Sequence, residues 1–126
     1  MNKPFQFTGR IRSFKYAFNG IRIMICSQHN AWLHALATAL VIGAGLYLRI
    51  ARFEWNWLIL AIMAVWSAEA LNTAFEFLAD ATTPAYHPLI GKAKDVAAGA
   101  VLIAALGSAA IGALVLGPHL VAWIGK

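Results

Sequence analysis

Residues 55–79 read WNWLILAIMAVWSAEALNTAFEFLA, and this stretch decides the fold. It is longer than the roughly 20 apolar residues that an α-helix needs to cross a bilayer. Trp55 and Trp57 stand at its start, as aromatic anchors do where a span meets the lipid headgroups. The stretch therefore predicts a transmembrane helix.

Two further apolar runs, residues 31–48 and 96–116, lie on either side of it. The first is broken only by His34 and Thr38, and as a helix it would be about 27 Å long, just enough to span. The last has Ser108 as its only polar side chain. We therefore expect an all-α membrane protein with three transmembrane helices, at about 31–48, 55–79 and 96–116.

The composition supports this prediction. Apolar residues make up 61% of the 126 residues, and charged residues only 12%. A soluble domain of this size could not bury so much apolar surface, so lipid must be the solvent for much of the chain. We expect a single integral membrane domain, residues 1–126. The lone Cys26 allows no internal disulfide, and no Cys/His cluster at zinc spacing accompanies it.

The chain begins with a basic, amphipathic segment at about residues 5–29. Half of the ten Lys and Arg residues lie within the first 22 positions, where they alternate with apolar residues: Lys3, Arg10, Arg12, Lys15 and Arg22. The pattern predicts a helix that lies on an anionic membrane surface with its apolar face among the headgroups. Since no nucleic-acid-binding signature accompanies the charge, we expect no nucleic-acid partner.

Basic residues also predict the orientation. The side of the membrane that holds the N-terminus and the 80–95 connection carries seven of them, whereas the side with Arg49, Arg52 and Lys126 carries three. Basic residues are enriched in cytoplasmic segments. We therefore expect the N-terminus and the 80–95 connection in the cytoplasm.

Polar residues form a stripe along the middle span. At about 100° per residue, four side chains return to nearly the same side of a helix: Glu69, Asn72, Glu76 and Asp80. Acidic groups inside a span are costly and mark functional sites, although they can also merely hydrogen-bond neighbouring helices. Because the stripe cannot face lipid, we take it as the candidate site.

Lys92, Lys94 and Asp95 stand just before the last span. Alone, they could be an interfacial cluster in which Asp95 caps a helix. Beside a carboxylate stripe on the same membrane face, Lys94 can neutralise phosphate charge. The last span is rich in Gly and Ala, which lets helices approach closely in lipid and predicts an oligomer.

Two ordered motifs carry a family resemblance. Residues 69–80 read EALNTAFEFLAD and fit the pattern E-x-L-N-[ST]-A-x-E-x-x-x-D. Residues 86–88, YHP, and 93–102, AKDVAAGAVL, follow in order. Through them, nearly the whole chain resembles the small bacterial diacylglycerol kinase and undecaprenol kinase family. This likeness implies an ATP-dependent lipid kinase of the bacterial inner membrane, a homotrimer whose sites are shared between chains.

The resemblance also implies roles for individual residues. Glu69 would be the general base that takes the proton of the lipid hydroxyl as this attacks the γ-phosphate of ATP. Glu76 would bind Mg²⁺, while Asn72, Lys94 and Asp95 would position the nucleotide and neutralise its charge. The remaining positions implied around the nucleotide are Arg10, Tyr16, Gln28, Ala85, Tyr86 and His87.

Gln28 departs from the family pattern, in which a glutamate at this place is a second metal ligand. A glutamine offers only a neutral oxygen, so a Mg²⁺ site of Gln28 and Glu76 should be weaker than one with two carboxylates. Asn30, His34 and the 98–100 run, AGA, fit the undecaprenol kinase branch and favour a polyprenol over diacylglycerol as the lipid alcohol. On its own, His34 is interpreted as a buried histidine rather than a ligand.

Two other functions fit parts of the sequence. A small proton-coupled transporter would also need an intramembrane glutamate such as Glu69, but it leaves Lys94, Asp95 and the 80–95 connection unexplained. A degenerate family member, suggested by Gln28, would bind lipid or nucleotide without efficient phosphate transfer.

Overall fold

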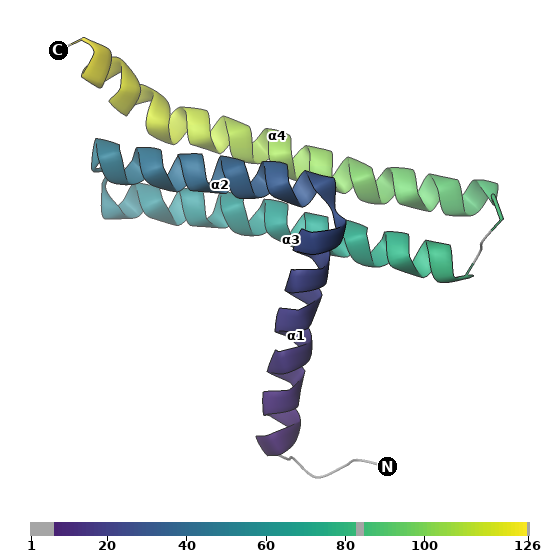
Figure 1. Ribbon diagram of the computed structural model, residues 1–126. Coiled ribbons are helices and arrows are strands. Elements are labelled where there is room, and N and C mark those ends of the chain that lie inside the picture. The colour runs from purple at the N-terminus through teal and green to yellow at the C-terminus, as the bar shows by residue number, and fades with distance from the viewer. Residues whose placement is uncertain (1–6, 83–84, 126) are drawn as a thin grey trace.

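Four helices make up the computed structural model, which describes residues 7–82 and 85–125. The helices are α1 (Phe7–Ser27), α2 (His29–Leu48), α3 (Arg52–Thr82) and α4 (Pro88–Ile124). Helices α2, α3 and α4 run alongside one another, whereas α1 leaves this bundle at a steep angle (Figure 1). No strand occurs in the described part of the chain, so the prediction of an all-α fold is confirmed.

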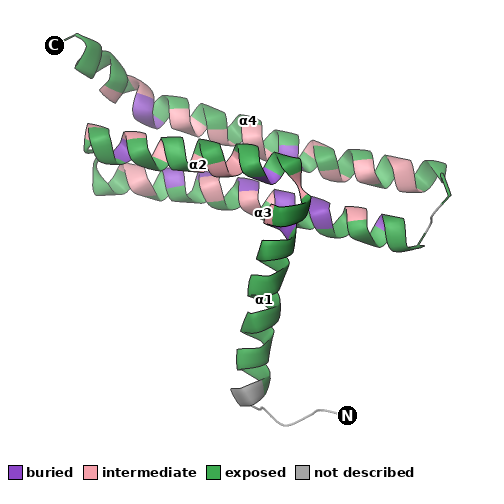
Figure 2. Cartoon of the chain, viewed as in Figure 1, coloured by how far each residue is buried: buried purple, intermediate pink, exposed green. Residues whose placement is uncertain are grey.

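The three bundle helices are each long and apolar enough to cross a membrane, and each contains one of the predicted spans. Exposed residues cover their outer faces (Figure 2). Large apolar side chains on these faces include Leu40, Leu60, Leu102 and Ile103, all more than half exposed. Soluble monomers rarely expose apolar surface on this scale. The chain is therefore a three-span membrane protein.

The end of the bundle where α2 meets α3 is closely packed. Arg49 ends α2 in the left-handed region, with φ 52°, and its N–H bonds to Leu46 O. A Cβ atom on Gly45 would lie 2.8 Å from Cη2 of Trp55, so glycine lets the two helices approach here. Beside this turn lies a core cluster that joins α3 to α4: Ile50, Leu58, Val115 and Leu116. This packing sets α3 antiparallel to α2 and fixes which of its faces points inward.

The helices continue beyond the predicted spans at the other end. α3 runs to Thr82 and α4 begins at Pro88, so the connection is shorter than the predicted 80–95 segment. His87 supplies the N-cap of α4, because its ring Nδ1 accepts a hydrogen bond from Leu89 N at 3.2 Å. Pro88 follows at the first turn, where its missing N–H does no harm. Lys94 and Asp95 therefore lie on a helix.

α4 also continues through Pro118, which lies inside the helix. A proline cannot donate to the carbonyl one turn earlier, and the C-terminal part of α4 bends away from α2 and α3 (Figure 1). The neighbouring His119 is tied to α3, since its Nε2 lies 2.9 Å from Glu54 Oε1 and 3.0 Å from Oε2. This contact fastens the extension to the bundle.

The first helix is a surface helix. Residues 9–23 are exposed, and Met24, near the end of α1, is buried. Gln28 separates α1 from α2 with an extended backbone, φ −108° and ψ 119°, and thereby makes the sharp turn between them. α1 thus meets the bundle only near its C-terminal end, which brings Gln28 next to α3.

Candidate active site

Glu69 lies in the middle of α3 with no part of its side chain exposed. Neither of its carboxylate oxygens has a hydrogen-bond partner within the described ranges 7–82 and 85–125. His34 of α2 approaches it, with Nε2 3.5 Å from Oε2. Thr73 Oγ1 donates a hydrogen bond to the backbone oxygen of Glu69 at 2.8 Å. This bond therefore does not satisfy the carboxylate.

This burial is difficult to explain by stability. A buried carboxylate that lacks hydrogen bonds is costly, and an apolar side chain of similar volume would pack at lower cost. The single chain gives no support to the alternative interpretation, in which Glu69 merely hydrogen-bonds a neighbouring helix, because its described residues form no hydrogen bond with the Glu69 oxygens. An intramembrane acid of this kind is expected where a membrane protein performs chemistry or transport.

A second polar cluster lies two helical turns further along α3. Gln28 Nε2 donates a hydrogen bond to Glu76 Oε2 at 2.8 Å, and Asn72 Nδ2 donates to Glu76 Oε1 at 3.3 Å. Asn72 Oδ1 is buried and has no partner among the described residues. The fold therefore brings together three of the predicted site residues, one of which is distant in sequence.

The cluster fits a Mg²⁺ ion better than a transition metal. The described residues contain no group of three or more His, Cys, Asp or Glu side chains that could hold a metal. Glu76 offers one carboxylate, and the amides of Gln28 and Asn72 can offer oxygens, since a rotation exchanges amide nitrogen and oxygen. Mg²⁺ commonly takes one or two carboxylates and completes its shell with water and substrate phosphate. The unpartnered oxygen of Asn72 suits such an oxygen-rich shell.

The polar stripe predicted from the sequence runs from the bundle interior to the surface. Glu69 and Asn72 are buried, Glu76 is half-buried, and the Asp80 side chain is 71% exposed. Asp80 Oδ1 accepts a hydrogen bond from Lys94 Nζ at 3.1 Å, which places the lysine at the open end of the stripe. Asp95 is exposed on the same turn of α4.

Other predicted site residues lie apart from Glu69 and Glu76 in the single chain. Arg10 and Tyr16 are on α1, which points away from the bundle (Figure 1). Three more are exposed directly before α4: Ala85, Tyr86 and His87. A single chain thus brings together the predicted site residues around Glu69 and Glu76. The remaining predicted residues are spread over its surface.

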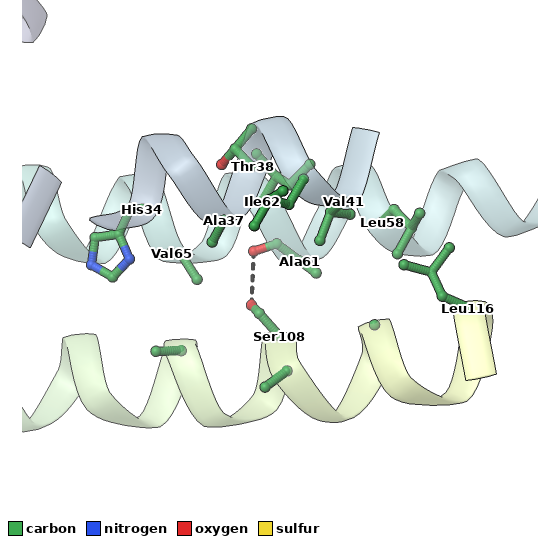
Figure 3. Close-up of a pocket in the computed structure, with 14 residues that line it drawn as sticks. His34, Ala37, Thr38, Val41, Leu58, Ala61, Ile62, Val65, Ser108 and Leu116 are labelled. Carbon is green, nitrogen blue, oxygen red and sulfur yellow. Dashed lines mark hydrogen bonds between the residues drawn. The ribbon is translucent and has the colours of Figure 1, made fainter. Parts of the chain in front are cut away.

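An apolar cavity of about 420 Å³ adjoins the site between α2, α3 and α4. His34 stands at one end of it and Leu116 at the other (Figure 3). Its walls are aliphatic apart from His34, Thr38 and Ser108, and Ser108 Oγ donates to Ala61 O at 2.9 Å. Such a space accommodates a hydrocarbon chain rather than a polar ligand.

Sequence reasoning gave His34 no role of its own in the chemistry, yet it is the ionisable group that faces Glu69. Its position inside a membrane span was the available signal, because ionisable residues there are rare and commonly functional. Its distance to Glu69 could not be read from the sequence, since the two residues lie on different helices.

Comparisons with known proteins agree with these features. The sequence model of the prokaryotic diacylglycerol kinase family matches residues 15–116. The chain is 38% identical over 109 residues to the undecaprenol kinase of Bacillus subtilis, covering 86% of this chain and 89% of that enzyme. Identity is also 38% over 109 residues to a diacylglycerol kinase of Synechocystis, of whose length the chain spans 62%. The diacylglycerol kinase of Escherichia coli is 31% identical over 103 residues, covering 82% of this chain and 84% of the enzyme.

The three spans, the buried acid and these matches define a membrane-embedded lipid kinase. More particularly, the chain belongs to the prokaryotic diacylglycerol kinase family, as the two motifs predicted. A kinase of this family needs a nucleotide phosphate donor and a lipid acceptor.

Proposed function

We propose that the protein transfers the γ-phosphate of ATP, in the presence of Mg²⁺, to the hydroxyl group of a membrane lipid alcohol. The observation that carries this proposal is the fully buried Glu69, whose oxygens have no partner among the described residues. Seven residues further along α3, about 10 Å along a helix, lies the cluster around Glu76. One helix face thus carries both an acidic residue that can take the proton of the lipid hydroxyl and an oxygen-rich cluster that can serve the metal and the nucleotide.

Each residue has a defined part in this reaction. Glu69 takes the proton of the lipid hydroxyl while the oxygen bonds to the γ-phosphorus and the bond to the bridging oxygen of ADP breaks. Glu76 and Gln28 would hold Mg²⁺, which would neutralise charge on the phosphate oxygens, while Asn72, Lys94 and Asp95 would position the nucleotide. In a poorly hydrated site such charges interact more strongly than in water.

The lipid reaches this site from within the bilayer. Its hydroxyl meets Glu69, while part of its hydrocarbon chain occupies the apolar cavity that begins at His34. We favour a polyprenol such as undecaprenol, because Asn30, His34 and the 98–100 run fit the undecaprenol kinase branch. Equal identity to relatives with either name makes diacylglycerol the second candidate.

A homotrimer completes the site in this proposal. Residues 9–23 of α1 are exposed in the single chain, and Arg10 and Tyr16 belong to this helix, which points away from the bundle (Figure 1). A neighbouring copy can bring these residues over the open end of the stripe near Lys94. The seven-to-three distribution of basic residues supports a bacterial inner-membrane location with the N-terminus and the site in the cytoplasm.

One experiment separates this function from its alternatives. Purified protein in lipid nanodiscs receives radiolabelled ATP, Mg²⁺ and a mixture of undecaprenol and diacylglycerol, and the lipid extract is resolved by chromatography. We expect labelled polyprenyl phosphate as the main product. Binding of ATP and lipid without transfer would instead indicate a degenerate family member. Proton flux through vesicles without binding of ATP would indicate a transporter.

A further inference from the structure

His34 and Glu69 face each other across the contact between α2 and α3. His34 Nε2 lies 3.5 Å from Glu69 Oε2, with 16% of the histidine side chain exposed and none of the glutamate. In the described part of the chain, neither His34 Nε2 nor either Glu69 oxygen has a hydrogen-bond partner. Two polar groups that face each other without another partner can satisfy one another by sharing a proton.

The histidine ring is held in place by residues of both helices. Its centroid lies 6.4 Å from that of Trp66 in an edge-to-face arrangement, with an interplanar angle of 67°. Trp66 Nε1 in turn donates a hydrogen bond to Thr38 Oγ1 at 3.1 Å. Thr38 lies one turn after His34 on α2, and Trp66 lies one turn before Glu69 on α3. The two helices thus fix the ring against the carboxylate.

We propose that His34 is a positioning residue for Glu69 and receives the proton that Glu69 takes from the lipid hydroxyl. This inference rests on the proposed lipid kinase function. The hydroxyl O–H bond breaks, its electron pair forms the bond to the γ-phosphorus of the nucleoside triphosphate, and the nucleoside diphosphate leaves with the electrons of the broken P–O bond. The proton passes from Glu69 Oε2 to His34 Nε2, and water takes it up from the exposed part of the ring after the lipid product has left the cavity.

Physical chemistry favours this path. Glu69 has no exposed surface, whereas part of the His34 side chain is exposed, so His34 offers the proton a path to water. Imidazole is a stronger base than a carboxylate in water, and it is the common proton carrier in enzymes. The 3.5 Å separation is only slightly longer than a hydrogen bond, and such distances in sites without substrate commonly shorten when the substrate is bound.

The test compares His34→Ala with the native protein in nanodiscs that contain undecaprenol, ATP and Mg²⁺. We expect kcat to fall about a hundredfold, as for loss of a proton-transfer group, with the KM for ATP unchanged. Added imidazole should restore most of the rate, because the space left by the ring adjoins the 420 Å³ cavity. Pyrrole, which has the same shape without a basic nitrogen, should restore none. His29→Ala, which removes an exposed histidine from the same helix, serves as the matched control.

Equal rescue by pyrrole and imidazole would mean that His34 only fills space, and the proposal would be overturned. An unchanged kcat in His34→Ala would overturn it as well. If that variant does not fold, His34→Gln keeps the size and polarity of the side chain but cannot accept a proton, and the same loss is expected. Failure of the native protein and His29→Ala to transfer phosphate would refute the kinase function itself, an outcome distinct from native activity that does not depend on His34.

Discussion

Replacing Gln28 by glutamate tests the proposed cation site through charge alone. Gln28 Nε2 donates to Glu76 Oε2 at 2.8 Å, so a glutamate here would bring two carboxylates to nearly hydrogen-bond distance. Without a cation the two groups repel each other and the hydrogen bond is lost. With a divalent cation between them, both are attracted to it. We therefore expect Gln28→Glu to destabilise the metal-free protein and to strengthen Mg²⁺ binding.

The size of the effect follows from the separation and the partial burial. Two unit charges about 4 Å apart interact by about 4 kcal/mol at an effective dielectric constant of about 20. Glu76 is only half-buried, and solvent and side-chain movement reduce this value. We expect Gln28→Glu to lower the free energy of unfolding of the metal-free protein by roughly 1–2 kcal/mol and to strengthen Mg²⁺ binding by roughly the same amount. The stronger binding corresponds to an apparent Mg²⁺ requirement about tenfold lower.

Two measurements check this prediction. Phosphate transfer is titrated with Mg²⁺ at fixed ATP and lipid, and thermal unfolding is followed in EDTA and in Mg²⁺. Glu76→Gln is expected to raise the Mg²⁺ requirement, and Asn56→Asp, the same amide-to-acid change at an exposed position at the other end of the bundle, to leave it unchanged. If Gln28→Glu leaves the titration unchanged while Glu76→Gln shifts it, position 28 is not a metal position in this protein.

Two further predictions concern topology and packing. In a Cys26→Ser background, single cysteines at 81–91 should react with an impermeant reagent only from the cytoplasmic side and those at 49–54 only from outside; the reverse pattern would separate the site from ATP. Gly45→Ala should lower the unfolding temperature relative to Gly43→Ala, because its Cβ would lie 2.8 Å from Trp55 Cη2 whereas a Cβ at residue 43 meets nothing within 4 Å. Equal unfolding temperatures would show that this close approach adds nothing to stability.

Much of the fold could be predicted because membrane spans are encoded locally. Three apolar runs of sufficient length are enough to predict three helices in lipid, whatever their mutual packing. The ends of the helices depend on tertiary contacts instead. α4 continues past Pro118 and is held there by His119 and Glu54, which are 65 residues apart in sequence. The span predicted from the sequence ends at about residue 116, before this continuation.

The candidate site likewise combines features that are local in the sequence with contacts that depend on tertiary packing. The spacing of Glu69, Asn72 and Glu76 predicted a shared helix face, since these residues lie on one element. The contact of Gln28 with Glu76 joins residues 48 positions apart, and only the family resemblance suggested it. Helical spacing could not reveal that His34 faces Glu69, because the rotation of α2 about its own axis is set by packing against α3.

The most direct test of the central claim is the single-turnover rate of phosphate transfer by Glu69→Gln. Glutamine keeps the size of the side chain and suits its burial, but it cannot accept the proton of the lipid hydroxyl. With radiolabelled ATP and undecaprenol in nanodiscs, we expect the rate to fall about 10²- to 10⁴-fold while nucleotide binding and the oligomeric state stay unchanged. Glu54→Gln, which removes a carboxylate from the other end of α3, should retain the native rate. Transfer by Glu69→Gln at the native rate would contradict the assignment of Glu69 as the base.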